Sequence, residues 1–156
     1  MPLVDLATAK RELRVTHDAE DADITRKLAS AEQQAALFMN RNIYATQDAL
    51  NAAIEAAPAA LAAASTAYAE AADAAWLLAT ETERDLAADD ATSAWRDAQQ
   101  DYRMARRGIV LNDSIRTAIL LITASLWEHR GDEDAIEGIP PAARAFLWPY
   151  RVGLGV

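Results

Sequence analysis

The feature that most constrains the fold is a stretch of 63 residues, 45–107, of which 24 are alanine. After Pro58 the chain contains neither glycine nor proline until Gly108. Alanine favours helices strongly and fills little core volume, so this stretch predicts long helices. Because the whole chain has only two Phe, four Trp and four Tyr, we expect an all-α protein and exclude an all-β fold.

Apolar and small residues within 45–107 recur in steps of four and three, which is the spacing of helices that pack along a seam. This pattern predicts an antiparallel helical hairpin. We expect its turn at residues 80–83, with Asp89-Asp90 as a rival position, and we expect Pro58 to start a new helix or kink the first arm. The predicted seam residues are Ile54, Leu61, Tyr68, Trp95 and Tyr102.

The flanking stretches, 1–44 and 108–156, predict a small helical bundle, so that the chain is one domain, 1–156, with 45–107 inserted. Helical spacing and capping residues predict helices near 6–13, 19–41, 113–130 and 142–147. The expected core residues of this bundle are Leu6, Leu13, Leu28, Phe38, Ile119, Ile122 and Leu126.

Charge and composition exclude several classes of function. The net charge is −9, whereas proteins that grip DNA phosphates are normally basic. There is no cysteine, which removes disulfides, thiolate metal sites and cysteine nucleophiles. No stretch is apolar for long enough to span a bilayer. The sequence therefore predicts a protein without a membrane span and without tight DNA binding.

Candidates for catalysis are few. His17 and His129 are far apart and lack a ligand partner at helical spacing, so we interpret both as surface residues. The pairs Glu20-Asp21 and Asp89-Asp90 could form acid–base or metal sites, but carboxylates at helix starts are the commoner explanation. We therefore expect no enzyme activity, no cofactor and no metal.

Two further groups have alternative interpretations. The basic cluster 103–107 could contact DNA or an acidic partner, or it could simply favour the negative end of a helix. The aromatic rings of the hairpin could form a recognition surface or thicken a core built from alanine. These rings are Tyr68, Trp76, Trp95 and Tyr102.

Two separated stretches of the chain carry motifs that occur together in one protein family. The first, residues 4–24 with the helix that follows them, has a Leu…Lys…Leu-Arg opening and an acidic helix start. The second includes an apolar helix closing on Glu-His-Arg130, then Ile139-Pro-Pro and Phe146-Leu-Trp-Pro-Tyr-Arg151. As a set, these motifs resemble the head–tail connector (adaptor) proteins of long-tailed bacteriophages and related gene transfer agents. That family usually has a short connection where this chain carries 45–107.

The resemblance implies a structural virion protein at the head–tail interface, made in the host cytoplasm, with no catalytic residues. It implies a homo-oligomeric ring, dodecameric in the family, that lies beneath the portal protein and extends the channel for double-stranded DNA. Its lower face would dock the stopper or a tail-completion protein. The candidate residues for portal docking are Trp148, Pro149, Tyr150, Arg151, Val152, Leu154 and Val156.

Two alternatives stay open at this point. The C-terminal aromatic residues could fold back onto their own helices instead of meeting a partner. The whole chain could be a coiled-coil scaffold or interaction module with no role in a phage.

Overall fold

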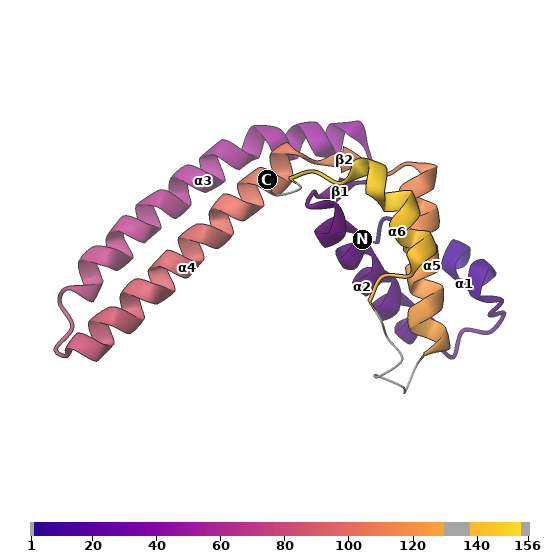
Figure 1. Cartoon of the computed structure of the whole chain (residues 1–156), viewed down its shortest axis with the longest axis horizontal. Helices are drawn as coiled ribbons and strands as arrows, with labels where there is room; N and C mark the ends of the chain where they lie inside the picture. The colour runs from indigo at the N-terminus through magenta and orange to yellow at the C-terminus, as the bar shows by residue number, and fades with distance from the viewer. Residues whose placement is uncertain (1, 130–137, 154–156) are drawn as a thin grey trace. The chain divides into compact units, whose positions relative to one another are not determined.

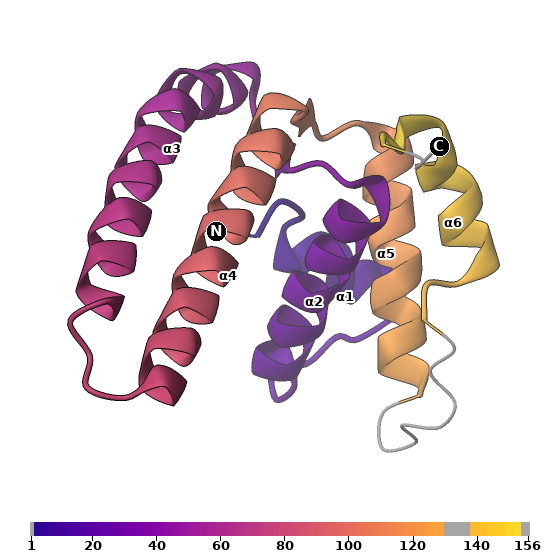
Figure 2. The same cartoon turned by 60° about the vertical axis from the view of Figure 1, so that its left-hand side comes forward.

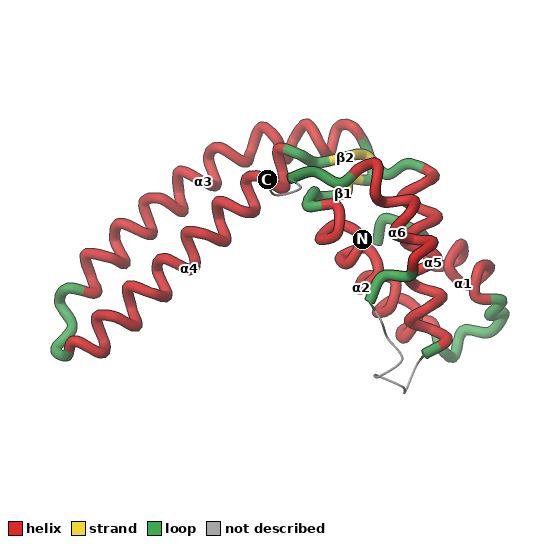
Figure 3. The backbone as a smooth tube through the Cα atoms, viewed as in Figure 1, coloured by secondary structure: helices red, strands yellow, loops and turns green. Residues whose placement is uncertain are grey.

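The computed structural model describes residues 2–129 and 138–153, and helices dominate this part of the chain (Figure 1). Figure 3 shows how little strand accompanies them. The prediction of an all-α fold is confirmed. Where the sequence suggests one domain with an insertion, the chain divides into two compact units, residues 1–46 with 109–156 and residues 47–108.

The first unit is a bundle of four α-helices. Its helices are α1 (Leu6–Leu13), α2 (Asp21–Met39), α5 (Asp113–Glu128) and α6 (Pro141–Leu147), followed by a 3-10 turn, η2 (Trp148–Tyr150). Helix α5 packs against α2, α1 and α6, as Figure 2 also shows. This unit therefore joins elements from both ends of the chain around α5.

Local chemistry sets the helix ends in the bundle. The Asp5 carboxylate accepts the Thr8 N–H at 2.8 Å and begins α1, and the Asn112 side chain accepts the Ile115 N–H at 3.0 Å and begins α5. Such caps replace hydrogen bonds that the first turn of a helix lacks. Helix α2 ends where Asn40 takes a left-handed conformation, with φ of 55°.

The core of this unit is built from α2, α5 and α6, with Val4 and Ala9 from the N-terminal end. Leu28, Ile119 and Ile122 are buried, and the other four expected core residues are partly buried against this core. The list of expected core residues omits many of its members, although the helical spacing of Ile24, Ala31, Ala35 and Ile115 helps to predict the helices in which they lie. The buried residues outside that list are Val4, Ala9, Ile24, Ala31, Ala35, Met39, Ile115, Ala118, Ala143 and Leu147.

Two short strands mark the points where the chain leaves and re-enters the bundle. β1 (Ile43–Tyr44) pairs in parallel with β2 (Ile109–Val110), in the register Ile43 with Ile109. The Ile109 and Leu111 amides donate to the Asn42 and Tyr44 carbonyls, at 2.9 and 2.8 Å. This pairing brings together residues that stand 66 positions apart in the sequence.

The second unit is a hairpin of α3 (Gln47–Ala75) and α4 (Glu81–Arg106), which lie side by side (Figures 1 and 2). The turn predicted at 80–83 is wrong by about one helical turn, because Thr80 caps α4 and residues 76–80 form the connection. The rival position, Asp89-Asp90, lies inside α4. Pro58 does not start a new helix, since α3 continues through it.

Candidate assembly surfaces

The chain ahead of α1 is attached to α2 by one carboxylate. Oε1 of Glu32 accepts the backbone N–H groups of Leu3 at 2.7 Å and Val4 at 3.0 Å. Burial raises the pKa of Glu32, and the two N–H donors oppose this change. Val4 is buried in the core, so this contact fixes the N-terminal end rather than forming a binding site.

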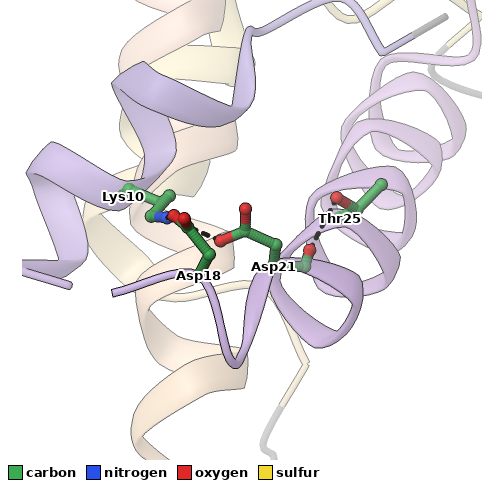
Figure 4. Close-up of polar contacts among 4 residues, drawn as sticks. All are labelled: Lys10, Asp18, Asp21 and Thr25. Carbon is green, nitrogen blue, oxygen red and sulfur yellow. Dashed lines mark hydrogen bonds and ion pairs between the residues drawn. The ribbon is translucent and has the colours of Figure 1, made fainter. Parts of the chain in front are cut away.

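The acidic stretch before α2 interacts with a lysine of α1. Lys10 Nζ lies 2.6 Å from a carboxylate oxygen of Asp18 and 2.6 Å from one of Asp21, as Figure 4 shows. The hydrogen bonds that Lys10 donates to Asp18 and Asp21 raise the pKa of Lys10, and the bond to Asp18 lowers the pKa of Asp18. Asp21 is therefore a partner of Lys10 and lies in the first turn of α2, so this member of the Glu20-Asp21 pair has a structural role.

Residues after α6 return to the C-terminal end of α2. The Val152 N–H donates to the Met39 carbonyl at 3.0 Å, and the Arg41 guanidinium donates to the Tyr150 carbonyl at 3.3 Å. Tyr150 packs against the core. Tyr150 and Val152 therefore fold back onto the chain's own helices, which is the alternative to portal docking. The candidate docking residues Leu154 and Val156 lie outside the described residues.

Trp148 and Arg151 differ from Tyr150 because they remain accessible. Trp148 is 55% exposed and its ring lies 6.4 Å from that of Phe38. The Arg151 guanidinium lies over both rings, 5.1 Å from the Phe38 centroid and 5.6 Å from the Trp148 centroid. Phe146, at 42% exposed, adds a third aromatic ring on α6. Arg151 is thus an exposed cation held by aromatic faces.

The surface of this segment has one sign of charge. Residues 138–153 contain Arg144 and Arg151 and no acidic residue. Within the residues that the structure describes, neither arginine forms an ion pair. We define the C-terminal patch as Arg144, Phe146, Trp148 and Arg151.

Four of the five predicted seam residues of the hairpin are partly buried, and the fifth, Tyr68, is 38% exposed. The rings of Tyr68 and Trp95 lie 6.2 Å apart across the two helices. A groove of about 250 Å³ beside these rings is lined otherwise by alanines of α3 and α4. The rings therefore fill part of the space that small side chains leave.

The connection between α3 and α4 exposes large apolar side chains. Trp76 is 75% exposed and Leu77 is 87% exposed. An adjacent groove of about 510 Å³ runs from Tyr68 and Trp76 to the carboxylates Glu81 and Asp85. We define the tip patch as Trp76, Leu77, Glu81 and Asp85.

Hydrogen bonds hold the backbone of this connection in place. The Leu77 and Leu78 amides donate to the Ala74 and Ala75 carbonyls. Nε of Arg84 donates to the Leu78 carbonyl at 2.8 Å. The Thr80 hydroxyl accepts the Glu83 N–H at 3.2 Å while the Glu83 carboxylate accepts the Thr80 N–H at 3.1 Å. This reciprocal capping box fixes the start of α4.

Other sequence candidates have local structural roles or none. His129 Nδ1 lies 2.9 Å from the Ser125 carbonyl at the end of α5, and His17 is exposed. Asp89 and Asp90 are exposed in the interior of α4, so the prediction that they are carboxylates at a helix start is wrong. In the cluster 103–107, Arg106 donates to the Tyr102 hydroxyl at 2.9 Å.

Two further observations concern metal binding and membrane insertion. Within residues 2–129 and 138–153, no three His, Asp or Glu side chains are grouped closely enough to hold a metal ion. No helix in those same ranges is long and apolar enough to cross a membrane.

Comparison of the chain with protein-family models, with curated protein sequences and with solved structures finds no match.

Proposed function

We propose that this chain is the structural subunit of a head–tail connector ring, which lies beneath the portal of a tailed phage or gene transfer agent. In this proposal it has no catalytic role. Copies of the chain surround the channel for double-stranded DNA and provide the face on which the stopper or tail docks.

One observation carries the proposal. The two stretches that resemble the connector family belong to one compact unit, although the 63 residues of 45–107 lie between them in the sequence. Helices α1 and α2 supply the first stretch, α5 and α6 supply the second, and they share one core. The family resemblance therefore corresponds to a coherent bundle, and the departure from the family corresponds to a separate hairpin.

Charge gives the proposal independent support. A channel wall must let DNA pass without holding it, and attraction to phosphates would slow that passage. The net charge of −9 favours repulsion of DNA over attraction. An acidic subunit is thus suited to a channel and poorly suited to a DNA-binding role.

The proposal is tested by mixing the purified chain with the portal protein encoded in the same genome. We expect the two proteins to co-elute and to form ring-shaped particles in electron micrographs. A portal protein from an unrelated phage serves as the control and should not co-elute. Failure to associate with the cognate portal at any mixing ratio would contradict the proposal.

A scaffold without a phage role is the second candidate, and the hairpin favours it. Residues 47–108 form a compact unit of their own and expose Trp76 and Leu77. Exposed apolar side chains of this size are typical of protein-binding surfaces. A scaffold would bind its partner through the hairpin and would not bind a portal protein, so the same mixing experiment separates the two candidates.

A further inference from the structure

We propose that the tip patch of one copy docks on the C-terminal patch of a second copy. This inference names the contact by which copies associate, and it rests on the proposed function only for the expectation that they form a ring. The juxtaposed groups are the Glu81 and Asp85 carboxylates with Trp76 and Leu77 on one side, and Arg144 and Arg151 with Phe146 and Trp148 on the other.

The first argument is the distribution of exposed apolar side chains. Large hydrophobic residues are exposed at a few positions in the described ranges, and most of these belong to the outer part of the hairpin or to the segment after α5. Exposure of this kind is costly in water unless a partner covers it. The exposed residues are Leu37, Tyr68, Trp76, Leu77, Leu78, Leu86, Phe146 and Trp148.

The second argument is charge complementarity. The outer part of the hairpin, residues 61–95, has seven acidic residues and one basic residue. Its inner part is balanced, with four acidic and four basic residues, so the net −6 of the hairpin lies entirely in the outer part. The segment 138–153 has two basic residues and no acidic residue. Opposite charges on two apolar patches favour their association and fix its register.

The third argument is that both patches have charges available for a partner. In the part of the chain that the structure describes, Glu81, Asp85, Arg144 and Arg151 take part in no ion pair. The groove beside Trp76 is wide enough, at about 510 Å³, for a side chain of the size of arginine. Its charged lining is Glu81, Asp85 and Arg84, and Nε of Arg84 already donates to the Leu78 carbonyl, so a second guanidinium would meet two carboxylates against one cation.

The fourth argument is preorganisation. The capping box of Thr80 and Glu83 and the Arg84–Leu78 hydrogen bond hold the tip before any partner arrives. The rings of Phe38 and Trp148 hold Arg151 in the same way. Surfaces fixed in advance lose less conformational entropy on binding.

A contact between two different patches is heterologous. A pair of copies then keeps one free tip patch and one free C-terminal patch, so association continues: it ends in a ring when the rotation between copies closes, and gives an open filament when it does not. The sequence suggests portal docking for residues 148–156. Charge complementarity favours a second copy at Trp148 and Arg151 instead, and portal binding at those residues is a competing outcome of the experiment.

The experiment is a charge-swap rescue in the full-length chain, followed by sedimentation velocity. One variant carries Glu81→Arg with Asp85→Arg, and the other carries Arg144→Glu with Arg151→Glu. We expect each variant alone to self-associate about tenfold more weakly than the wild type. An equimolar mixture of the two should recover association, because each reversed patch then meets a reversed partner.

A matched control reverses two exposed carboxylates of the inner hairpin, Glu55→Arg with Asp97→Arg, and should leave association unchanged. Circular dichroism establishes that every variant is folded. A second variant, Leu77→Ser, removes apolar area that is 87% exposed and should weaken association without affecting folding.

Several results would overturn the inference: a wild-type chain that stays monomeric, a mixture that fails to recover association, or a control as weak as the tip variant. Loss of portal binding by the Arg144/Arg151 variant with unchanged self-association would assign the C-terminal patch to the portal and also overturn it. Rescue by the mixture without any portal binding would support this contact while contradicting the proposed function.

Discussion

Oε1 of Glu32 lies 3.0 Å from the backbone nitrogen of Val4, so a partly buried carboxylate on α2 holds the chain that precedes α1. The same oxygen accepts the Leu3 N–H. Burial raises the pKa of this carboxyl above its ordinary value of 4.5, which means that the folded state disfavours the ionised form. The Glu32 carboxylate therefore stabilises the fold as a hydrogen-bond acceptor, while its negative charge opposes folding.

Two substitutions separate the hydrogen bonds from the charge. Glu32→Ala removes the acceptor and leaves two N–H groups without it, so we expect a loss of about 1–3 kcal/mol in the free energy of unfolding. Glu32→Gln keeps an acceptor oxygen and cannot ionise. Because the folded pKa is raised, the wild type loses stability as pH rises through the ordinary and then the raised pKa.

The glutamine variant should therefore gain stability relative to the wild type between about pH 3 and about pH 7. Urea unfolding at both pH values measures this difference. Equal behaviour of the alanine and glutamine variants at both pH values would contradict the role given to the hydrogen bonds.

Ile119 is fully buried between α5 and its neighbours. Ile119→Ala should lower the free energy of unfolding by about 2–5 kcal/mol, since it removes apolar contacts and leaves a cavity. Leu37→Ala is the matched control, because Leu37 is 61% exposed on α2. Chemical denaturation of the two variants checks the prediction, and a similar loss in both would contradict this assignment of the core.

The bundle was largely predictable because its signals are local. Asp5 and Asn112 precede helical spacing and cap the helices that follow them. Its core was predictable only in part. Ala31 and Ala35 recur at helical spacing, but in a chain this rich in alanine that spacing does not distinguish buried alanines from exposed ones. The Met39 carbonyl accepts the N–H of Val152, 113 positions later, and a contact of that range has no local signal.

Thr80 begins α4 and is hydrogen-bonded to Glu83 in both directions. Thr80→Ala removes the cap and should cost about 1 kcal/mol of unfolding free energy. The bond from the Thr80 hydroxyl lowers the pKa of Glu83, so this stabilisation is present above the ordinary pKa of 4.5 and is lost as pH falls through the lowered value.

The control for this cap is Thr66→Ala. Thr66 is exposed inside α3, where alanine is the better helix former, so this change should be neutral or stabilising. Thermal melts followed by circular dichroism compare the two variants. A loss from Thr66→Ala equal to that from Thr80→Ala would show that the cap contributes nothing specific.

The hairpin itself was predictable from heptad spacing, but its turn was not. The motif Thr80-Glu-Thr-Glu83 is polar and resembles a loop, yet it is a capping box and starts a helix. The actual connection includes Trp76, Leu77 and Leu78, which read as a continuation of the apolar seam. Apolar residues in a turn contradict the usual polarity of loops, and this contradiction is the signal that sequence reasoning missed at the tip patch.

Lys10 interacts with two carboxylates, and its side chain is largely covered, at 14% exposed. Lys10→Met keeps the aliphatic stem and removes the charge, so it should lower the free energy of unfolding slightly at low salt. Because the pKa of Lys10 is raised, the ion pair stabilises the fold until pH rises through that raised value. Because the pKa of Asp18 is lowered, the stabilisation is lost at the acid end only as pH falls through that lowered value. Urea unfolding at low and high salt should show the difference shrinking as salt screens the pair. A loss that is independent of salt would assign the effect to packing of the stem.

Arg151 combines a charge with a planar surface, and lysine separates the two. Arg151→Lys keeps the charge and weakens stacking on Phe38 and Trp148, whereas Arg151→Gln removes the charge. Because these contacts are exposed, neither change should lower the free energy of unfolding by more than about 1 kcal/mol.

The strength of self-association should distinguish the two variants. If the charge of Arg151 meets Glu81 and Asp85 of a second copy, Arg151→Gln should self-associate more weakly than Arg151→Lys. Sedimentation velocity at low and high salt measures this difference, and the salt dependence should be smaller for Arg151→Gln, since one charge has been removed from the contact. The reverse order of the two variants would mean that stacking, and not charge, determines what Arg151 contributes.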